Sequence, residues 1–452
     1  MSVGNLYARL ERLSPAQLLL AMFASVIFLG SLLLWLPFAA MDGVRVSYLE
    51  ALFTAASAVC VTGLVVVDTG STYSLTGQLI LLALIQAGGL GIMTFASIGF
   101  KLVGAKLPLT HQMALEDSFY QRSAAEEFLH TFPRILKLLL LIQAAGFIGL
   151  SLGMLFVLPV GDALYSALFH TISAFCNAGF SIYSDSLTRF AGNPIVMFVT
   201  MALIVSGGLG YLVLVDLQAF CGSRSRSNED RRPFRFTFHS RVVLLASVVL
   251  IAGGTIALLI SGVRDGGVVP SLGAALFQSV TARTAGFNTV DIGSLPLTGL
   301  LIITILMFIG AAPGSCGGGI KVTSFVIWMA RVRSALHGEP RVSLLGREIP
   351  TDLVLRAVAV IGLATSWNAM GVLLLSHVMP AAPLKEIVFE QISAFGTVGL
   401  STGLTPLLPP LARVWIIATM FVGRLGPITL LFSFITKRTT RVKYAEGRVM
   451  IG

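Results

Sequence analysis

Four glycines recur at regular intervals along this chain, and each closes a short apolar stretch and precedes a large apolar residue. The motif returns about once per quarter of the 452 residues, at Gly63, Gly179, Gly286 and Gly399. Such a period indicates fourfold internal repetition. In a membrane protein, four glycine-bearing loops can surround one axis and replace the water around an ion with backbone carbonyl oxygens. The residues therefore predict a cation pore.

Glycine permits positive φ, so the carbonyls next to it can turn toward the axis without a Cβ clash. Any metal ion would then be held by backbone carbonyls only. The predicted filter residues are Val61, Thr62, Gly63, Asn177, Ala178, Gly179, Thr284, Ala285, Gly286, Thr397, Val398 and Gly399. Counted from Phe277, the third glycine comes one residue early compared with the other three repeats, so the filter is expected to be only pseudo-fourfold.

Three aspartates, Asp68, Asp185 and Asp291, lie just beyond the first three glycines. Two interpretations stay open for them. Acids in an outer vestibule would concentrate cations at the mouth of a pore, whereas aspartate is also an ordinary turn residue. The fourth repeat has Thr405 at this place, so the acids cannot form a ring of four.

The composition places the chain in a membrane. Hydrophobic residues make up 55%, charged residues 12%, and the mean hydropathy is +0.88, whereas soluble domains carry about 25% charge. The net charge is +10, but most Lys and Arg residues lie at the termini or between repeats. The positive-inside rule then makes both termini and the inter-repeat loops cytoplasmic. A basic cluster at residues 224–235 lies between spans, so nucleic-acid binding is not expected.

Each repeat reads as a long span, a short apolar segment, the glycine motif and a second long span. The short segments are too short to cross a bilayer, so we expect re-entrant pore helices. The expected long spans are Leu18–Ala40, Gln78–Lys101, Phe132–Leu158, Pro194–Phe220, Arg241–Ser261, Leu297–Met329, Leu353–Met379 and Leu411–Ile435. The expected pore helices are Tyr48–Val59, Ala163–Phe175, Pro270–Thr281 and Pro383–Phe395.

The predicted fold is an all-α polytopic membrane protein, with eight transmembrane helices and four pore helices around a pseudo-fourfold pore. The repeats are expected at residues 1–110, 111–222, 223–340 and 341–452, the last with a cytoplasmic tail. Glycine clusters in the second spans of the first two repeats, Gly88–Gly91 and Gly207–Gly210, predict close helix packing.

The third repeat interrupts its second span with the segment Gly310–Lys321. One proline and five glycines cannot sustain a helix, so this span must break near mid-membrane. The break is either a movable gate below the filter or a static kink. The predicted gating residues are Gly310, Pro313, Gly314, Ser315, Cys316, Gly317, Gly318, Gly319 and Lys321. Nucleotide binding is not expected here, because Ile320 separates the last glycine from Lys321 and no buried strand precedes the segment.

Arg424 lies at a comparable depth in the fourth repeat. A charge within the membrane is costly and is by default a functional hypothesis. Its guanidinium is expected to pair with carbonyls of the glycine-rich segment or to limit cation flow. A structural salt bridge is the alternative.

The four glycine motifs, the segment Gly-Ser-Cys-Gly-Gly-Gly-Ile-Lys and Arg424 together resemble the superfamily of K⁺ transporters that includes Trk, Ktr and plant HKT proteins. The resemblance extends from about residue 15 to the end. Within the superfamily the chain is more similar to the pore-forming subunits of the KtrB type, because it begins directly with the first repeat and ends in a KtrB-like tail. A Trk-type transporter is the alternative.

This resemblance implies a homodimer in the bacterial inner membrane that takes up K⁺ through one pore per subunit, often in dependence on Na⁺. It also implies a cytosolic ring of KtrA-type subunits that bind a nucleotide and gate the pore, so no cofactor is expected in this chain. The gate role would belong to Gly310–Lys321 and the paired arginine to Arg424. An ion-coupled carrier for another solute is disfavoured, because the spans hold almost no Asp, Glu or His. No nucleophile or metal constellation suggests an enzyme.

Overall fold

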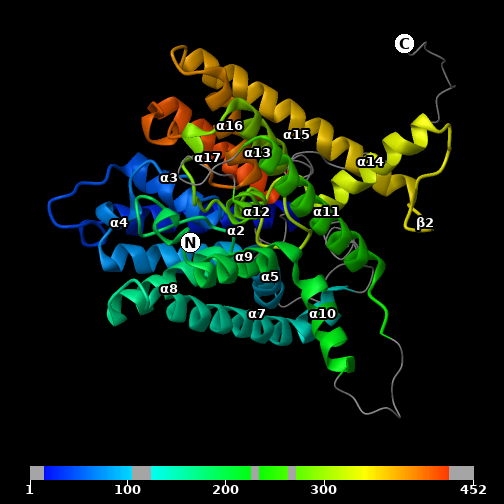
Figure 1. The fold of residues 1–452 in the computed structure, drawn as a ribbon, viewed down its shortest axis with the longest axis horizontal. Coiled ribbons are helices and arrows are strands. Elements are labelled where there is room, and N and C mark those ends of the chain that lie inside the picture. Colours follow the sequence, from blue (N-terminus) through cyan, green and yellow to red (C-terminus); the bar gives the residue numbers. More distant parts are fainter. Residues whose placement is uncertain (1–14, 104–123, 225–233, 263–270, 427–452) are drawn as a thin grey trace.

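The computed structural model describes residues 15–103, 124–224, 234–262 and 271–426. Nearly all of its regular structure is helical, and four similar units follow one another along the chain (Figure 1). The first unit contains α2 (Pro15–Trp35), η1 (Pro37–Ala39), the pore helix α3 (Tyr48–Val59), α4 (Thr69–Thr72) and α5 (Leu75–Val103). The second contains α7 (Ala124–Met154), the pore helix α8 (Val160–Phe175), η2 (Thr188–Phe190), α9 (Pro194–Leu209) and α10 (Tyr211–Arg224).

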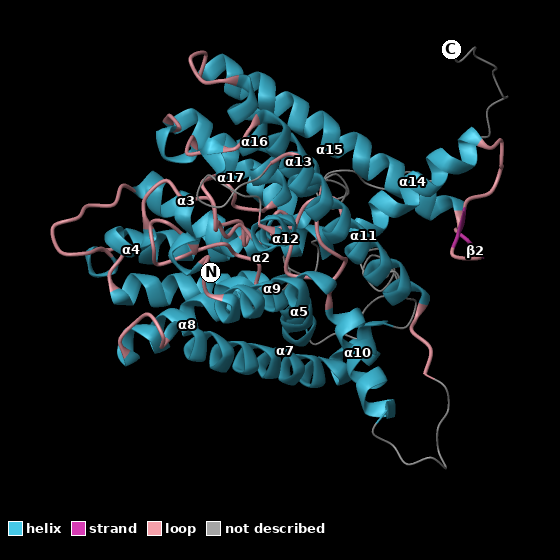
Figure 2. Cartoon of the chain, viewed as in Figure 1, coloured by secondary structure: helices cyan, strands magenta, loops and turns pink. Residues whose placement is uncertain are grey.

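The third and fourth units repeat this order. The third contains α11 (Phe238–Ile260), the pore helix α12 (Leu272–Thr281), η4 (Ile292–Ser294), α13 (Leu297–Phe308) and α14 (Val322–Leu336). The fourth contains α15 (Thr351–Val378), the pore helix α16 (Leu384–Gly396), η5 (Thr405–Leu407) and α17 (Pro410–Leu425). Between α14 and α15 lies a small antiparallel hairpin of β1 (Ser343–Leu344) and β2 (Arg347–Glu348), paired Ser343 to Glu348, which projects from the helical body (Figure 2).

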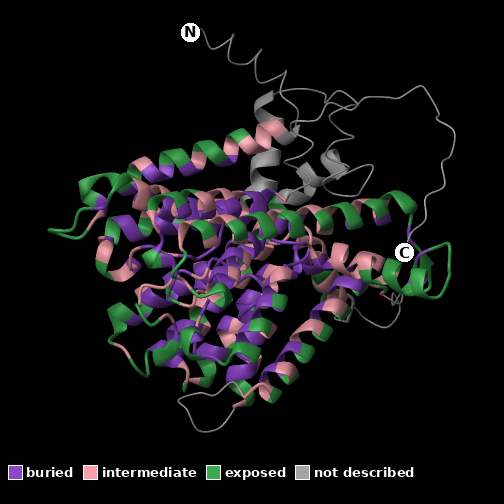
Figure 3. Cartoon of the chain, turned by 90° about the horizontal axis from the view of Figure 1, so that it is seen from above, coloured by how far each residue is buried: buried purple, intermediate pink, exposed green. Residues whose placement is uncertain are grey.

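The first long helix of each unit is long and apolar enough to cross a membrane. The four candidate spans are Gln17–Trp35, Pro133–Met154, Phe238–Ile260 and Thr351–Val378. Large apolar side chains such as Phe28, Leu141, Ile260 and Leu373 point outward from these helices. Exposed residues lie along the outside of the body, while buried residues gather inside (Figure 3). The pattern suits a body surrounded by lipid and built around a central core.

The four units close into a ring. The second long helix of each unit packs on the pore helix of the next: α5 on α8, α9 on α12, α13 on α16, and α17 on α3. The last of these contacts joins the fourth unit to the first, and Arg413 reinforces it with an ion pair to Glu50, 3.5 Å away. Accordingly α7 of the second unit and α15 of the fourth lie on opposite sides of the body in Figure 1. The predicted arrangement of repeats around one axis is confirmed.

The pore helices begin and end almost where the sequence predicts. Tyr48–Val59 agrees at both ends, because Ser47 and Glu50 form a capping box that sets its first residue. The predicted break in the third unit is also confirmed, since α13 ends at Phe308 and α14 begins at Val322.

One predicted span is wrong. The sequence predicts one continuous span over Pro194–Phe220, but α9 ends at Leu209 and α10 leaves it at 111°. Gly210 makes the turn with φ 81°, a conformation that a residue with a Cβ rarely adopts. The predicted span Leu411–Ile435 begins as α17, and its part beyond residue 426 lies outside the described residues.

Candidate ion-conduction pathway

Each pore helix is followed by one left-handed residue, two positions before the motif glycine. These residues are Val61 (φ 55°), Asn177 (φ 58°), Thr284 (φ 74°) and Thr397 (φ 49°). Positive φ is uncommon outside glycine and is strained for a β-branched side chain. Such strain costs about 1–3 kcal/mol per residue and persists where the surrounding structure enforces it, often at functional sites. Its recurrence at one position in all four repeats marks these loops as a specialised site.

The four motif glycines form a closed ring with carbonyl oxygens. A Cβ added to each would clash with the carbonyl oxygen of the residue before the next repeat's glycine: Gly63 with Ala178, Gly179 with Ala285, Gly286 with Val398, and Gly399 with Thr62. The contact between Gly399 of the fourth repeat and Thr62 of the first closes the ring. All eight residues that occupy the two positions before the glycines are completely buried. The structure therefore brings the predicted filter residues together around one axis.

The shorter third motif reaches the same ring by a change at its pore-helix end. In the other repeats, the amide before the glycine donates to the carbonyl of a serine five residues earlier, as Thr62 does to Ser57 at 2.8 Å. In the third repeat, Ala285 donates to the carbonyl of Thr281, only four residues earlier, at 2.9 Å. The predicted asymmetry is thus confined to the helix end.

The segment Gly310–Lys321 lies below this ring as a loop with joined ends. Gly310 donates its amide to the Ile320 carbonyl at 2.8 Å, and Val322 donates to Ala311 at 3.2 Å. These two bonds tie the end of α13 to the start of α14. The residues between these bonds therefore form a loop that leaves the helix axis and returns to it.

The broken helix of the second repeat supplies acceptors for this loop. Helix C-termini leave carbonyls without intrahelical partners, and α9 ends just before Gly210. Its Gly207 and Gly208 carbonyls accept the amides of Cys316 at 3.1 Å and Ala312 at 3.0 Å. From the fourth repeat, the Gly423 carbonyl accepts the amide of Gly319 at 3.0 Å. The loop thus bridges two opposite repeats.

The loop also touches the filter directly. The Gly318 amide donates to Thr397 Oγ1 at 2.9 Å, and a Cβ on Gly317 would clash with Thr284 Oγ1. Both threonines are the left-handed residues of their filter loops. The Thr284 hydroxyl also hydrogen-bonds the Asn177 amide at 3.2 Å. The filter and the loop beneath it therefore form one connected structure.

Arg424 is 2% exposed and binds the loop as predicted. Its Nη1 donates to the Cys316 carbonyl, and its Nη2 donates to the Gly88 carbonyl of the first repeat. Among the described residues Arg424 forms no salt bridge, and both of these partners are backbone carbonyls. Lys321 Nζ donates to the Gly317 carbonyl at 2.6 Å. Two cations therefore hold loop carbonyls below the filter.

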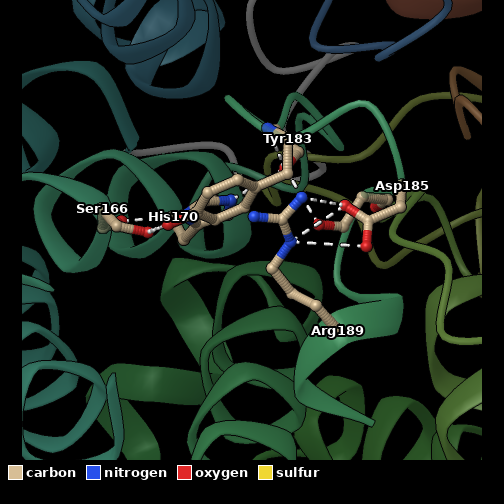
Figure 4. Close-up of polar contacts among 7 residues, drawn as sticks. Ser166, His170, Tyr183, Asp185 and Arg189 are labelled. Atoms are coloured by element: carbon tan, nitrogen blue, oxygen red, sulfur yellow. Dashed lines mark hydrogen bonds and ion pairs between the residues drawn. The ribbon is translucent and has the colours of Figure 1, made fainter. Parts of the chain in front are cut away.

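The three outer aspartates serve local structure. Asp68 caps α4 through the Ser71 amide at 2.8 Å, and Asp291 accepts the Gly293 amide at 3.1 Å. Asp185 forms an ion pair with Arg189 at 2.9 Å (Figure 4). These contacts account for the acids as turn residues, and their effect on cations stays a prediction.

The glycines of the second long helices pack as predicted. A Cβ on Gly88 would clash with the Val59 carbonyl oxygen, and one on Gly207 with that of Phe175. In the fourth repeat, a Cβ on Gly423 would likewise clash with the carbonyl oxygen of Phe395. Small residues are required at these three positions because a backbone carbonyl at the end of a pore helix lies directly against each glycine.

One set of buried polar residues inside the pore helices is absent from the predicted site. They are Thr54, His170, Gln278 and Glu390, which are at most 1% exposed. Each directly follows a buried phenylalanine: Phe53, Phe169, Phe277 or Phe389. That adjacency was the available signal.

Comparison with known proteins identifies the family. A family described as TrkH, cation transport protein, matches residues 13–441. The chain belongs to this family of cation transport proteins. It is 36% identical to the Ktr system potassium uptake protein B of Bacillus subtilis, over 98% of this chain and 97% of that one. It is 34% identical to the potassium/sodium uptake protein NtpJ of Enterococcus hirae, over 98% of both chains.

The fold has a counterpart among solved structures. The crystal structure of the potassium transporter TrkH from Vibrio parahaemolyticus matches with a TM-score of 0.69, covering 92% of this chain and 83% of that one at 19% sequence identity. The predicted resemblance to the Trk and Ktr superfamily is therefore confirmed, as is the fold of four repeats in a multi-pass membrane protein.

Proposed function

We propose that this chain is the K⁺-translocating pore subunit of a bacterial K⁺ uptake system of the Ktr type. The observation that carries the proposal is the closed ring in which each motif glycine abuts the carbonyl oxygen of the next repeat. Full-length similarity to two proteins named for potassium uptake supports K⁺ as the ion.

Selection in this ring would follow from backbone geometry. Carbonyl oxygens replace the hydration shell of the ion, and the filter residues at the three positions ending in each glycine supply them. All four pore helices direct their C-termini at the ring, so the negative ends of their dipoles favour a cation. The left-handed residues before the glycines fix the direction of each carbonyl.

Gating would come from Gly310–Lys321. The hydrogen bonds of the loop to the second and fourth repeats and to Thr397 of the filter support a barrier role for it next to the ring. Movement of the loop would require breaking its bonds to the α9 carbonyls and to Arg424. A static kink would keep these bonds during transport.

The assembly is inferred from relatives. Proteins named for a Ktr system imply more than one component, and we propose a homodimer regulated by a cytosolic ring of KtrA-type nucleotide-binding subunits. The location would be the bacterial inner membrane with both termini cytoplasmic. The name of the Enterococcus relative includes sodium, which supports Na⁺ as a co-ion.

The direct test is uptake of ⁸⁶Rb⁺ in a K⁺-transport-deficient bacterial strain that expresses the chain. Uptake should exceed that of an empty-vector strain, should be competed by K⁺ more strongly than by Na⁺, and should change with added Na⁺ and with a co-expressed nucleotide-binding partner. Membrane abundance of the protein must be matched across strains. Uptake equal to that of the empty-vector strain would refute K⁺ transport. Uptake that the partner does not change would be consistent with a K⁺ pore but would refute its assignment to the Ktr type.

A further inference from the structure

The same position of each pore helix carries a buried polar side chain, and in three of the four repeats this side chain contacts the loop beyond the filter glycine. Thr54, His170, Gln278 and Glu390 occupy this position behind the filter. In three of the four repeats this side chain hydrogen-bonds a hydroxyl that lies two to six residues after the glycine. His170 binds Ser181, Gln278 binds Thr289, and Glu390 binds both Ser401 and Thr405. The strength of this link differs between repeats.

Glu390 makes the strongest link. One carboxylate oxygen accepts from Ser401 Oγ at 2.6 Å and from the Thr402 amide at 3.0 Å. The other accepts from Thr405 Oγ1 at 2.6 Å. The side chain is 0% exposed, and its two 2.6 Å contacts with hydroxyls have the length of hydrogen bonds to an ionised carboxylate, which are about twice as strong as neutral ones. The carboxylate thus clamps the outer half of the fourth filter loop.

His170 makes the corresponding link in the opposite repeat. Its Nδ1 lies 2.7 Å from the Ser166 carbonyl oxygen, which can only accept, so Nδ1 carries the proton. Its Nε2 then accepts from Ser181 Oγ at 3.0 Å. The ring stacks on Tyr183, which in turn lies under the Arg189 guanidinium, 4.0 Å from the ring centre (Figure 4).

The strained filter loops need such clamps. Left-handed backbone at Thr397 and Asn177 persists only where neighbouring groups over-determine it, and selection by carbonyls requires that the ring keep its size. We infer that Glu390 and His170 are positioning residues for the filter, and that the Glu390 carboxylate in particular maintains the preference for K⁺ over Na⁺. This inference rests on the proposed function.

The test replaces Glu390 by glutamine. The third repeat carries Gln278 at the equivalent position, so the fold accommodates this side chain, while the charge and the charge-assisted bonds are lost. Glu386→Gln, one turn earlier in the same helix, is the matched control. Purified variants are reconstituted in proteoliposomes, and competition of ⁸⁶Rb⁺ uptake by K⁺ and by Na⁺ is measured together with thermal unfolding in detergent.

We expect Glu390→Gln to unfold near the wild-type temperature and to take up ⁸⁶Rb⁺, with the ratio of Na⁺ to K⁺ inhibition constants reduced roughly tenfold, as for the loss of one charge-assisted hydrogen bond. Glu386→Gln should keep the wild-type ratio. An unchanged ratio in Glu390→Gln, or an equal change in the control, overturns the inference while the proposed function stands.

If Glu390→Gln does not fold, the ratio of Na⁺ to K⁺ inhibition constants is measured for His170→Gln. This variant also introduces glutamine, the residue that the third repeat carries at this position. A reduced ratio supports the inference, and a wild-type ratio overturns it. Absence of ⁸⁶Rb⁺ uptake in the wild-type protein would instead overturn the proposed function, and this inference with it.

Discussion

Arg424→Ala should raise ion flux without any cytosolic partner. The guanidinium is buried and donates to the Cys316 carbonyl inside the loop Gly310–Lys321. Truncation removes this bond from the state in which the loop lies below the filter. An open loop no longer makes the bond, so the substitution destabilises only the closed state.

The size of the effect follows from that one bond. A hydrogen bond with a charged donor contributes about 1.5–3 kcal/mol, which corresponds to a factor of about 10 to 150 in the ratio of open to closed loops. The second bond of Arg424, to Gly88, is not counted because Gly88 lies in the first repeat and not in the loop. Removal of a positive charge from the cation path acts in the same direction.

The measurement is ⁸⁶Rb⁺ efflux from proteoliposomes containing purified protein alone. Arg341→Ala is the control: this arginine lies on the surface, where it pairs with Glu348 at 3.3 Å away from the loop, and its truncation should leave efflux unchanged. Arg424→Gln keeps one donor and should give an intermediate rate. Wild-type efflux from Arg424→Ala, at equal reconstituted protein, would refute the role of this arginine in closing the pore.

Two further substitutions and one deletion test the filter, the packing and the loop. Gly399→Ser should lower selectivity for K⁺ over Na⁺ in competition assays, because its Cβ would lie 3.0 Å from the Gly63 Cα; Gly403→Ser, with a similar φ but open space, should not. Deleting Ala312–Gly318 should raise partner-independent ⁸⁶Rb⁺ flux, and unchanged flux would mean that the loop is not the barrier. Gly207→Ala should destabilise the protein by about 1–3 kcal/mol through overpacking, seen as a lower unfolding temperature in detergent than for Gly253→Ala, whose Cβ meets nothing within 4 Å.

The repeated elements were predictable because their signals are local. The length and apolar character of Tyr48–Val59 identify a pore helix, and the sequence bounds agree with α3 at both ends. The break at Gly310–Lys321 was equally accessible, since its glycines and proline exclude a continuous helix. The break at Gly210 was not, because a glycine cluster in an apolar helix is equally typical of close packing.

The polar residues behind the filter escaped prediction for a related reason. Glu390 and His170 look exceptional only when the four pore helices are superposed, which reveals that each repeat places a polar residue after the same phenylalanine. Their partners lie eleven or more residues away in loops without periodicity, so no spacing rule connects them.

By itself the sequence determined that this is a membrane protein of four repeats with a glycine in each filter loop, because hydropathy and period are properties of neighbouring residues. Only the tertiary structure decided which groups meet below the filter. Arg424 reaches Cys316 across 108 residues and Gly88 across 336, and the helix broken at Gly210 offers its carbonyls to a loop in another repeat. Such pairings depend on how the closed ring brings distant helix ends together, and local sequence does not encode that arrangement.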